Sequence, residues 1–277
     1  MKYSFALVIG EAIGLRCFKR MCNIKNIKIK FVISSDKKYD SAVKNICKRY
    51  KIKFLKKKNS LNKSLSCDYL ISIFSNLIIK EKYLKMFKFG CFNFHPAILP
   101  FYPGINPISG MIFNGEKNIG VTLHKMTKKI DGGNIILLKK TSITDDYNLI
   151  QCMKKIEKLT LKILNKFILT IKNNKKLKEQ LNDYKKKKKF PKTIPNNGKI
   201  NYKWNLTYFK RNFNAGYAGP YKSTWGKIYF LYSKKKKFIN NFYLTEKTLK
   251  KKLQKSSENV FYIKLKNKVI KVETSDN

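Results

Sequence analysis

Short apolar segments alternate with helical patterns through the first half of the chain, and this alternation restricts the folds available to it. Strand-like segments occur at Phe5–Ile9, Phe31–Ile33, Ile52–Leu55, Tyr69–Phe74 and Cys91–Phe94. Tyr69–Phe74 is apolar on both faces, as are the strands of a parallel sheet covered by helices. The pattern predicts an α/β fold with a Rossmann-like, doubly wound, mostly parallel sheet. Ligands of such sheets bind beyond the carboxyl ends of the strands, so the residues after Cys91–Phe94 are a good place for a site.

The pattern changes after residue 174. Residues 175–198 are polar and rich in Lys and end in Pro195 and Gly198, which is typical of a linker. Aromatic, alternating segments follow at Ile228–Tyr232, Val260–Leu265 and Val269–Val272, and the last two are spaced as a hairpin. We therefore expect a catalytic domain over residues 1–174, a basic linker over 175–198 and a small β-rich, OB-like domain over 199–277.

The net charge is large, yet its composition argues against a dedicated nucleic-acid surface. Of the 277 residues, 62 are Lys or Arg and 16 are Asp or Glu, a formal charge of +46. Only four of the cations are Arg, the residue best suited to bidentate contacts with phosphates and bases. The chain is also crowded with Asn, Ile, Phe and Tyr, as the product of an AT-rich genome would be. A biased composition is therefore favoured over a nucleic-acid footprint, which stays the alternative.

Two further classes of protein are disfavoured by the sequence. No apolar run approaches the roughly 20 residues that span a bilayer, and Phe5–Gly10 is too short for a secretory signal, so we expect no membrane segment. The six cysteines show neither a CxxC pair nor a spacing with histidine that binds metals. We expect buried thiols in a reducing cytoplasm, and no metal.

Charge disappears from one stretch of this highly charged chain. Residues 89–115 contain no Lys, Arg, Asp or Glu, and they hold four of the seven prolines. Prolines remove hydrogen-bond donors and are confined to turns and sheet edges, so this stretch is a poor core strand. We expect a rigid, uncharged loop that lines a pocket.

Three polar residues in and after this region have the chemistry of a site. Asn93 and His95 lie two apart and so share one side of a strand, and Asp131 opens an Asp-Gly-Gly turn. An amide and a protonated imidazole can stabilise the oxyanion of an acyl transfer, while a carboxylate orients the imidazole and accepts the proton of an attacking amine. No Ser or Cys stands by as a nucleophile, which favours direct transfer. For an Asn-x-His pair taken alone, a structural histidine is the alternative.

Three ordered blocks resemble the signature of the folate-dependent formyltransferase family. They are Asn93-Phe-His-Pro-Ala-Ile-Leu-Pro-Phe-Tyr-Pro-Gly-Ile-Asn-Pro, Asn114-Gly-Glu-Lys-Asn-Ile-Gly-Val-Thr-Leu-His-Lys-Met and Ile130-Asp-Gly-Gly-Asn-Ile-Ile. The resemblance implies transfer of a formyl group from 10-formyltetrahydrofolate to a primary amine, with Asn93, His95 and Asp131 as the catalytic residues. It also implies that the pterin docks beside two loops, through Phe74, Ser75, Asn76, Leu77, Ile78 and Gly132. For His124, in the second block, we expect a structural role.

The branches of this family differ in the amine they formylate. The glycinamide ribonucleotide branch typically ends near the first domain. The methionyl-tRNA branch usually carries basic residues after its Leu-Pro, where this chain has Phe101-Tyr102-Pro103-Gly104 and no cation. The Asn106-Pro107 pair and the short C-terminal domain suit the branch that acts on nucleotide-linked sugars, and residues 120–133 resemble the formyltransferase domain that acts on UDP-amino-arabinose.

We therefore expect a small-molecule amine acceptor, a nucleotide-linked amino sugar, with Tyr102, Asn114 and Glu116 on the acceptor side. Charged initiator tRNA is the alternative acceptor. A non-catalytic, RNA-binding protein on a decayed formyltransferase scaffold is a further alternative, and the intact set of Asn93, His95 and Asp131 argues against it.

Overall fold

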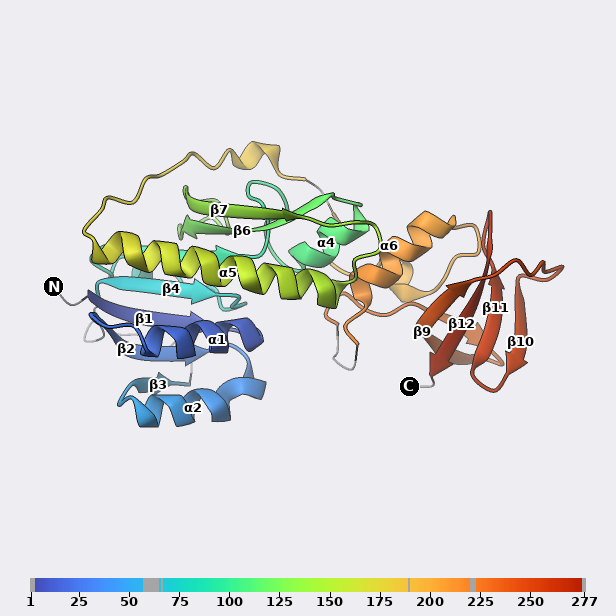
Figure 1. Cartoon of the computed structure of the whole chain (residues 1–277), viewed down its shortest axis with the longest axis horizontal. Helices are drawn as coiled ribbons and strands as arrows, with labels where there is room; N and C mark the ends of the chain where they lie inside the picture. The colour runs from blue at the N-terminus through green and yellow to red at the C-terminus, as the bar shows by residue number, and fades with distance from the viewer. Residues whose placement is uncertain (1–2, 57–64, 66, 189, 220–222, 276–277) are drawn as a thin grey trace. The chain divides into compact units, whose positions relative to one another are not determined.

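A seven-stranded sheet organises the first half of the chain (Figure 1). In this computed structural model, which describes residues 3–56, 65, 67–188, 190–219 and 223–275, the strand order is β3-β2-β1-β4-β5-β6-β7. Strands β1 to β5 pair in parallel, and β6 runs antiparallel to β5. The predicted Rossmann-like, mostly parallel sheet is confirmed. The strands are β1 Tyr3–Ile9, β2 Ile27–Ser34, β3 Lys53–Leu55, β4 Tyr69–Ile73, β5 Cys91–His95, β6 Asn118–Lys125 and β7 Ile135–Ser142.

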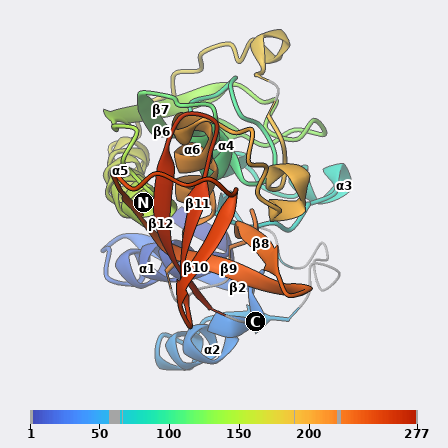
Figure 2. The same ribbon diagram turned by 90° about the vertical axis from the view of Figure 1, so that its right-hand side faces the viewer.

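Helices bury the central strands from both sides. In Figure 2, α1 (Glu11–Cys22) and α5 (Leu149–Lys172) lie on one side of the sheet and α3 (Glu81–Leu84) on the other. The ring of Phe167 on α5 packs against Tyr69 and Phe92 of the sheet, with centroid distances of 6.2 and 5.1 Å. The short helix α2 (Asp40–Arg49) follows β2. Burial on both faces explains why β4 is apolar at successive positions.

The chain divides by its internal contacts into two compact units. The first comprises residues 1–105, 119–141 and 155–188, and the second residues 106–118, 142–154 and 189–277. The second unit holds a five-stranded antiparallel sheet in the order β10-β11-β12-β9-β8, which confirms the predicted β-rich part. Its elements are α4 Pro107–Phe113, α6 Leu206–Gly216, β8 Tyr229–Tyr232, β9 Lys235–Leu244, β10 Leu253–Ser257, β11 Val260–Lys264 and β12 Val269–Ser275.

The uncharged stretch contains a helix, where the sequence indicated only a loop. Helix α4 begins with Pro107, whose missing N–H is tolerated in a first turn, after Asn106 in the left-handed region at φ +51°. Residues 107–112 are all buried. A Cβ added to Gly110 would lie 2.3 Å from the ring of Phe190. Charge is therefore missing here partly because a helix is buried.

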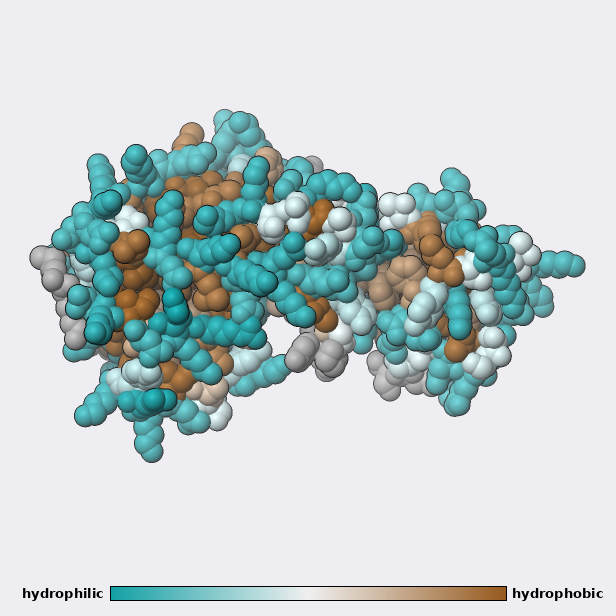
Figure 3. Space-filling view, in the orientation of Figure 1, coloured by the Kyte–Doolittle hydropathy of each residue, from teal (hydrophilic) through white to brown (hydrophobic). Residues whose placement is uncertain are grey.

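The surface and the thiols agree with the compositional expectations. In the view of Figure 3, hydrophilic side chains are spread over both units. The six cysteines are free thiols, five of them buried and Cys22 half-buried, and burial raises the pKa of Cys17 and of Cys91 to about 12. Within the residues described, none of the helices combines the length and the apolar character that a membrane crossing requires.

Candidate active site

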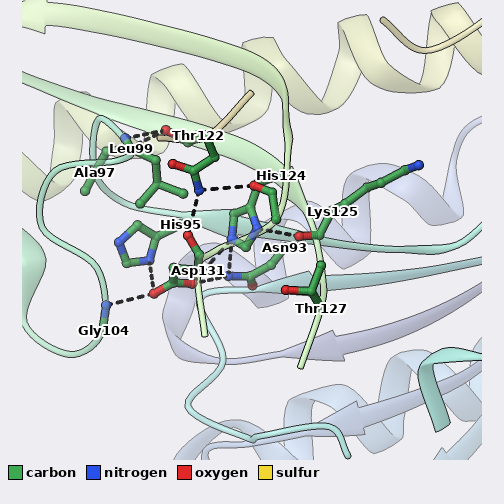
Figure 4. Close-up of polar contacts among 12 residues, drawn as sticks. Asn93, His95, Ala97, Leu99, Gly104, Thr122, His124, Lys125, Thr127 and Asp131 are labelled. Atoms are coloured by element: carbon green, nitrogen blue, oxygen red, sulfur yellow. Dashed lines mark hydrogen bonds and ion pairs between the residues drawn. The ribbon is translucent and has the colours of Figure 1, made fainter. Parts of the chain in front are cut away.

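Strand β5, the end of β6 and the turn before β7 bring the polar residues together (Figure 4). Asn93 and His95 project to one side of β5, and the register of the β5–β6 pair places His124 directly opposite Asn93. Asp131 stands in the turn before β7, at φ +51°. The structure therefore brings together the three residues predicted to be catalytic, and it adds His124.

The carboxylate of Asp131 is the centre of this cluster. Its Oδ2 accepts a hydrogen bond from the backbone N–H of Gly104 at 2.7 Å and lies 3.5 Å from Nδ1 of His95. Its Oδ1 lies 3.3 Å from Nε2 of His124 and 3.4 Å from Nδ2 of Asn93. Asp131 is only 8% exposed, and each of its carboxylate oxygens has polar partners within the protein.

These contacts decide the charge of the carboxylate. Burial by itself raises the pKa of Asp131, but the neighbouring charge of His95, the hydrogen bond and charge of His124 and the N–H of Gly104 lower it further than burial raises it. The net result is a pKa well below the ordinary value for Asp. The carboxylate is therefore ionised at neutral pH and holds a proton poorly.

The imidazole of His95 faces an acceptor on each side. Its Nε2 lies 2.8 Å from the backbone oxygen of Tyr102, to which it donates when protonated. Its Nδ1 faces the ionised Asp131 at 3.5 Å. Only the doubly protonated ring can donate toward both oxygens at once.

A side-chain hydroxyl of β6 fixes the loop after β5. The hydroxyl of Thr122 on β6 donates to the carbonyl of Ala97 at 2.6 Å and accepts from the N–H of Leu99 at 3.1 Å. Tyr102 sits in the left-handed region at φ +57°. The loop supplies the carbonyl of Tyr102 and the N–H of Gly104 to the cluster, as a rigid loop can.

His124, for which the sequence predicts a structural role, lies beside Asn93 and Asp131 in the cluster. Its Nδ1–H donates to the carbonyl of Lys125 at 2.7 Å, which leaves Nε2 as the nitrogen toward Asn93, 3.2 Å from Nδ2. A neutral His124 accepts from Asn93 at Nε2, and a protonated one donates to Asp131. The place of His124 in the cluster follows from the register between β5 and β6, and this register cannot be read from a single sequence.

We expect His124→Ala to slow catalysis about tenfold to a hundredfold, because Asn93 and Asp131 each lose a partner that fixes their orientation. Turnover at saturating substrates and the thermal unfolding midpoint should be measured together. A variant that folds like the wild type and turns over at the wild-type rate would show that His124 plays no part in the site.

The predicted folate loop follows β4 at the same sheet edge. Residues Phe74 to Ile78 come directly after Ile73, which pairs with Phe94 of β5. Phe74 has φ +50°, and its carbonyl lies so close to Gly10 that a Cβ there would approach to 2.2 Å. Ile78 is 59% exposed, so the loop presents an apolar side chain to solvent. Gly132, the other predicted folate contact, directly follows Asp131.

The residues predicted on the acceptor side belong to both compact units. The ring of Tyr102 is 2% exposed, and this residue reaches the cluster through its carbonyl. Asn114 and Glu116 belong to the second compact unit, where Asn114 follows α4 and the N–H of Glu116 bonds to the carbonyl of Met111 at 3.0 Å. Their role in binding an acceptor stays a prediction.

Comparisons of the sequence with known proteins identify a family. The model of the formyl transferase family matches residues 19–168, more than half of the chain. The bifunctional polymyxin resistance protein ArnA of Wigglesworthia glossinidia brevipalpis is 35% identical over 176 residues, covering 59% of this chain and 26% of ArnA. Methionyl-tRNA formyltransferase of Thermotoga maritima is 34% identical over 147 residues, covering 50% of this chain and 47% of that protein. The matches thus cover about a quarter and about half of these relatives.

A solved structure resembles the chain over its whole length. WlaRD, a sugar 3N-formyl transferase crystallised in the presence of dTDP and 5-N-formyl-THF, superposes with a TM-score of 0.72. The sequences are 22% identical, and the superposition covers 100% of this chain and 99% of that one. The likeness establishes a shared fold, including the β-rich C-terminal part.

Proposed function

The chain belongs to the formyl transferase family, and from this membership we propose that it transfers a formyl group from 10-formyltetrahydrofolate to a primary amine. The observation that supports the proposal best is the cluster of Asn93, His95 and His124 around an ionised Asp131 at the end of β5. Direct transfer of an acyl group to an amine needs groups that stabilise an oxyanion and groups that manage a proton. This cluster supplies both without a nucleophilic side chain.

The residues at the sheet edge suit a folate donor. An uncharged loop after β4, with its backbone polar groups and the exposed Ile78, offers hydrogen bonds and apolar contact to a planar ring. Phe74, Ser75, Asn76, Leu77 and Ile78, together with Gly132, would hold it. When bound, the donor supplies the formyl group that the amine receives.

Within the proposal, His95 and Asn93 act on the formyl oxygen. As the amine attacks, negative charge develops on that oxygen, and an imidazolium at His95 stabilises it electrostatically. Asn93 adds an amide N–H, since its contact to Asp131 is long at 3.4 Å and rotation of the side-chain amide can direct this N–H to the substrate. Asn93 is half-buried, so its amide is reachable.

Asp131 keeps His95 in the charged, oriented state. The new bond from the amine nitrogen to the formyl carbon replaces the bond from that carbon to N10 of the donor, which leaves as tetrahydrofolate. The lowered pKa of Asp131 makes it a weak base, so the proton shed by the amine does not stay on it and passes to the leaving nitrogen. The carboxylate thus acts mainly by holding the charge and direction of the imidazole.

For the acceptor we propose the amino group of a nucleotide-linked sugar. The support is the segment Phe101-Tyr102-Pro103-Gly104 beside His95, which carries no cation of its own even in a chain of this composition. One cation does lie near it, because Nζ of Lys188 is 5.4 Å from the centre of the Phe101 ring. Charged initiator tRNA is the second candidate, favoured by the Thermotoga maritima relative and by the net charge of +46. We further propose that the chain acts in the cytoplasm and divides into domains at residues 174 and 198.

A direct comparison of the two acceptors tests this choice. Wild-type protein is incubated with 10-formyltetrahydrofolate and either a nucleotide-linked amino sugar or methionyl-tRNA, and release of tetrahydrofolate is followed, with Asp131→Asn as the control. We expect acceptor-dependent release with the sugar and only background with tRNA. Faster release with methionyl-tRNA would reverse the choice of acceptor while leaving formyl transfer in place.

A further inference from the structure

A short segment from the predicted linker crosses the turn that carries Asp131. We call residues 179–184 the strap. Gln180 and Ile135 exchange two backbone hydrogen bonds of 2.8 Å, which fixes the strap against the start of β7. Glu179 forms an ion pair with Lys125 and accepts a hydrogen bond from Asn134 at 3.0 Å. At the other end, Nζ of Lys129 lies 3.8 Å above the centre of the Tyr184 ring.

One side chain of the strap reaches the turn itself. Nδ2 of Asn182 donates to the carbonyl of Asp131 at 2.8 Å and to the carbonyl of Gly133 at 3.1 Å. Asn182 is 6% exposed, and within the described part of the chain its Oδ1 has no hydrogen-bond partner. Turning the amide over would set Oδ1 against two carbonyl oxygens, so its orientation is determined by the turn. Burying the unpaired Oδ1 costs free energy, and the two hydrogen bonds donated by Nδ2 offset this cost.

The turn that Asn182 holds is conformationally restricted. Asp131 has φ +51°, a region that side-chain-bearing residues adopt at a cost. Gly133 has no room for a side chain, because a Cβ would lie 2.0 Å from the carbonyl oxygen of Lys125. The directions of the two carbonyls set the peptide planes of the turn, and these planes set the direction in which the Asp131 side chain leaves the backbone.

We propose that Asn182 is a positioning residue for the reaction, which holds the Asp131–Gly133 turn so that the carboxylate of Asp131 meets His95, His124 and the N–H of Gly104 together. The proposal rests on the formyl transfer proposed above. It assigns part of the predicted linker to the active site, because the strap acts on the cluster through the turn that carries Asp131. A shift of the carboxylate by a fraction of an ångström would separate it from the imidazole.

Two substitutions at Asn182 separate hydrogen bonding from packing. Asn182→Ala removes both bonds, whereas Asn182→Asp keeps the volume and replaces the donor by an oxygen that faces two carbonyls. We expect both variants to lower kcat about tenfold to a hundredfold, with KM for donor and acceptor within about twofold of wild type. Asn134→Ala is the matched control, because it removes another amide contact between the strap and the adjoining segment and should keep the wild-type kcat.

Hydrogen exchange gives a readout that does not depend on turnover. Both Asn182 variants should exchange the backbone amides of residues 129–135 faster than wild type, and Asn134→Ala should not reproduce this pattern. A wild-type kcat in Asn182→Asp, or unchanged exchange in the turn, would overturn the proposal. Wild-type protein that transfers no formyl group would instead refute the proposed function, and the exchange data would still decide whether Asn182 holds the turn.

Discussion

Asp131→Asn will lower kcat by about three orders of magnitude while the protein stays folded. The amide keeps the shape of the carboxylate and can still accept the N–H of Gly104, so the turn survives. It removes the negative charge opposite His95 and His124, and with it the electrostatic reason for a charged imidazole. Single-turnover rates with saturating donor and acceptor measure the effect, because they separate chemistry from product release.

The same variant makes a prediction about stability and pH. The pKa of Asp131 is lowered in the folded protein, so the carboxylate contributes stability above the unfolded pKa of about 3.9 and loses it as pH falls through the folded pKa. The wild type should therefore exceed Asp131→Asn in free energy of unfolding near neutral pH, with the difference shrinking in acid. A difference that grows as pH falls, or a variant that turns over at the wild-type rate, would contradict the assignment.

His95→Ala is expected to lower kcat by about two to four orders of magnitude. The variant removes the one ring that faces both Tyr102 and Asp131, and the backbone N–H of Gly104 stays with Asp131, so the loop keeps its anchor. Rates should be measured with and without added imidazole, which can restore part of the lost proton donor in the cavity left behind.

A matched comparison tests whether the effect belongs to His95 itself. Phe101→Ala changes a half-buried residue of the same loop and should lower kcat far less than His95→Ala. If His95→Ala keeps the wild-type rate, or if Phe101→Ala is equally slow, His95 has no special place in the reaction.

The sheet was predictable because its signal is local. A parallel strand buried on both faces must be apolar at successive positions, and β1 and β4 meet this requirement in the sequence. Strand β9 does not: it begins with Lys235, Lys236 and Lys237, and Ile239 is its one buried residue. Strand β9 is held by its pairing with β8 and β12, and its sequence lacks the hydrophobic alternation that would have predicted it.

The site was predictable in part, because three of its residues belong to local sequence motifs. Asn93 and His95 share a strand, and Asp131 opens a turn rich in glycine, so a motif brings all three to attention. His124 enters through the antiparallel register of β5 and β6, and Asn182 through hydrogen bonds across 51 and 49 residues of sequence. Contacts of this kind follow from the packed fold and leave no spacing to read.

The uncharged stretch, residues 89–115, indicates more about the position of the site than the net charge does. It marks both the loop that supplies the Tyr102 carbonyl and the buried helix α4. Among the residues that the structure describes, most lysines are exposed, in both units, as a compositional bias would place them.

The most direct test of the account is transfer of an isotopically labelled formyl group from 10-formyltetrahydrofolate, with the product amine analysed by mass spectrometry. Wild-type protein is predicted to place the label on the amino group of a nucleotide-linked sugar, with equal release of tetrahydrofolate, and Asp131→Asn to do so about a thousandfold more slowly. Folded wild-type protein that forms no labelled amide with any amino sugar or with methionyl-tRNA would contradict the account.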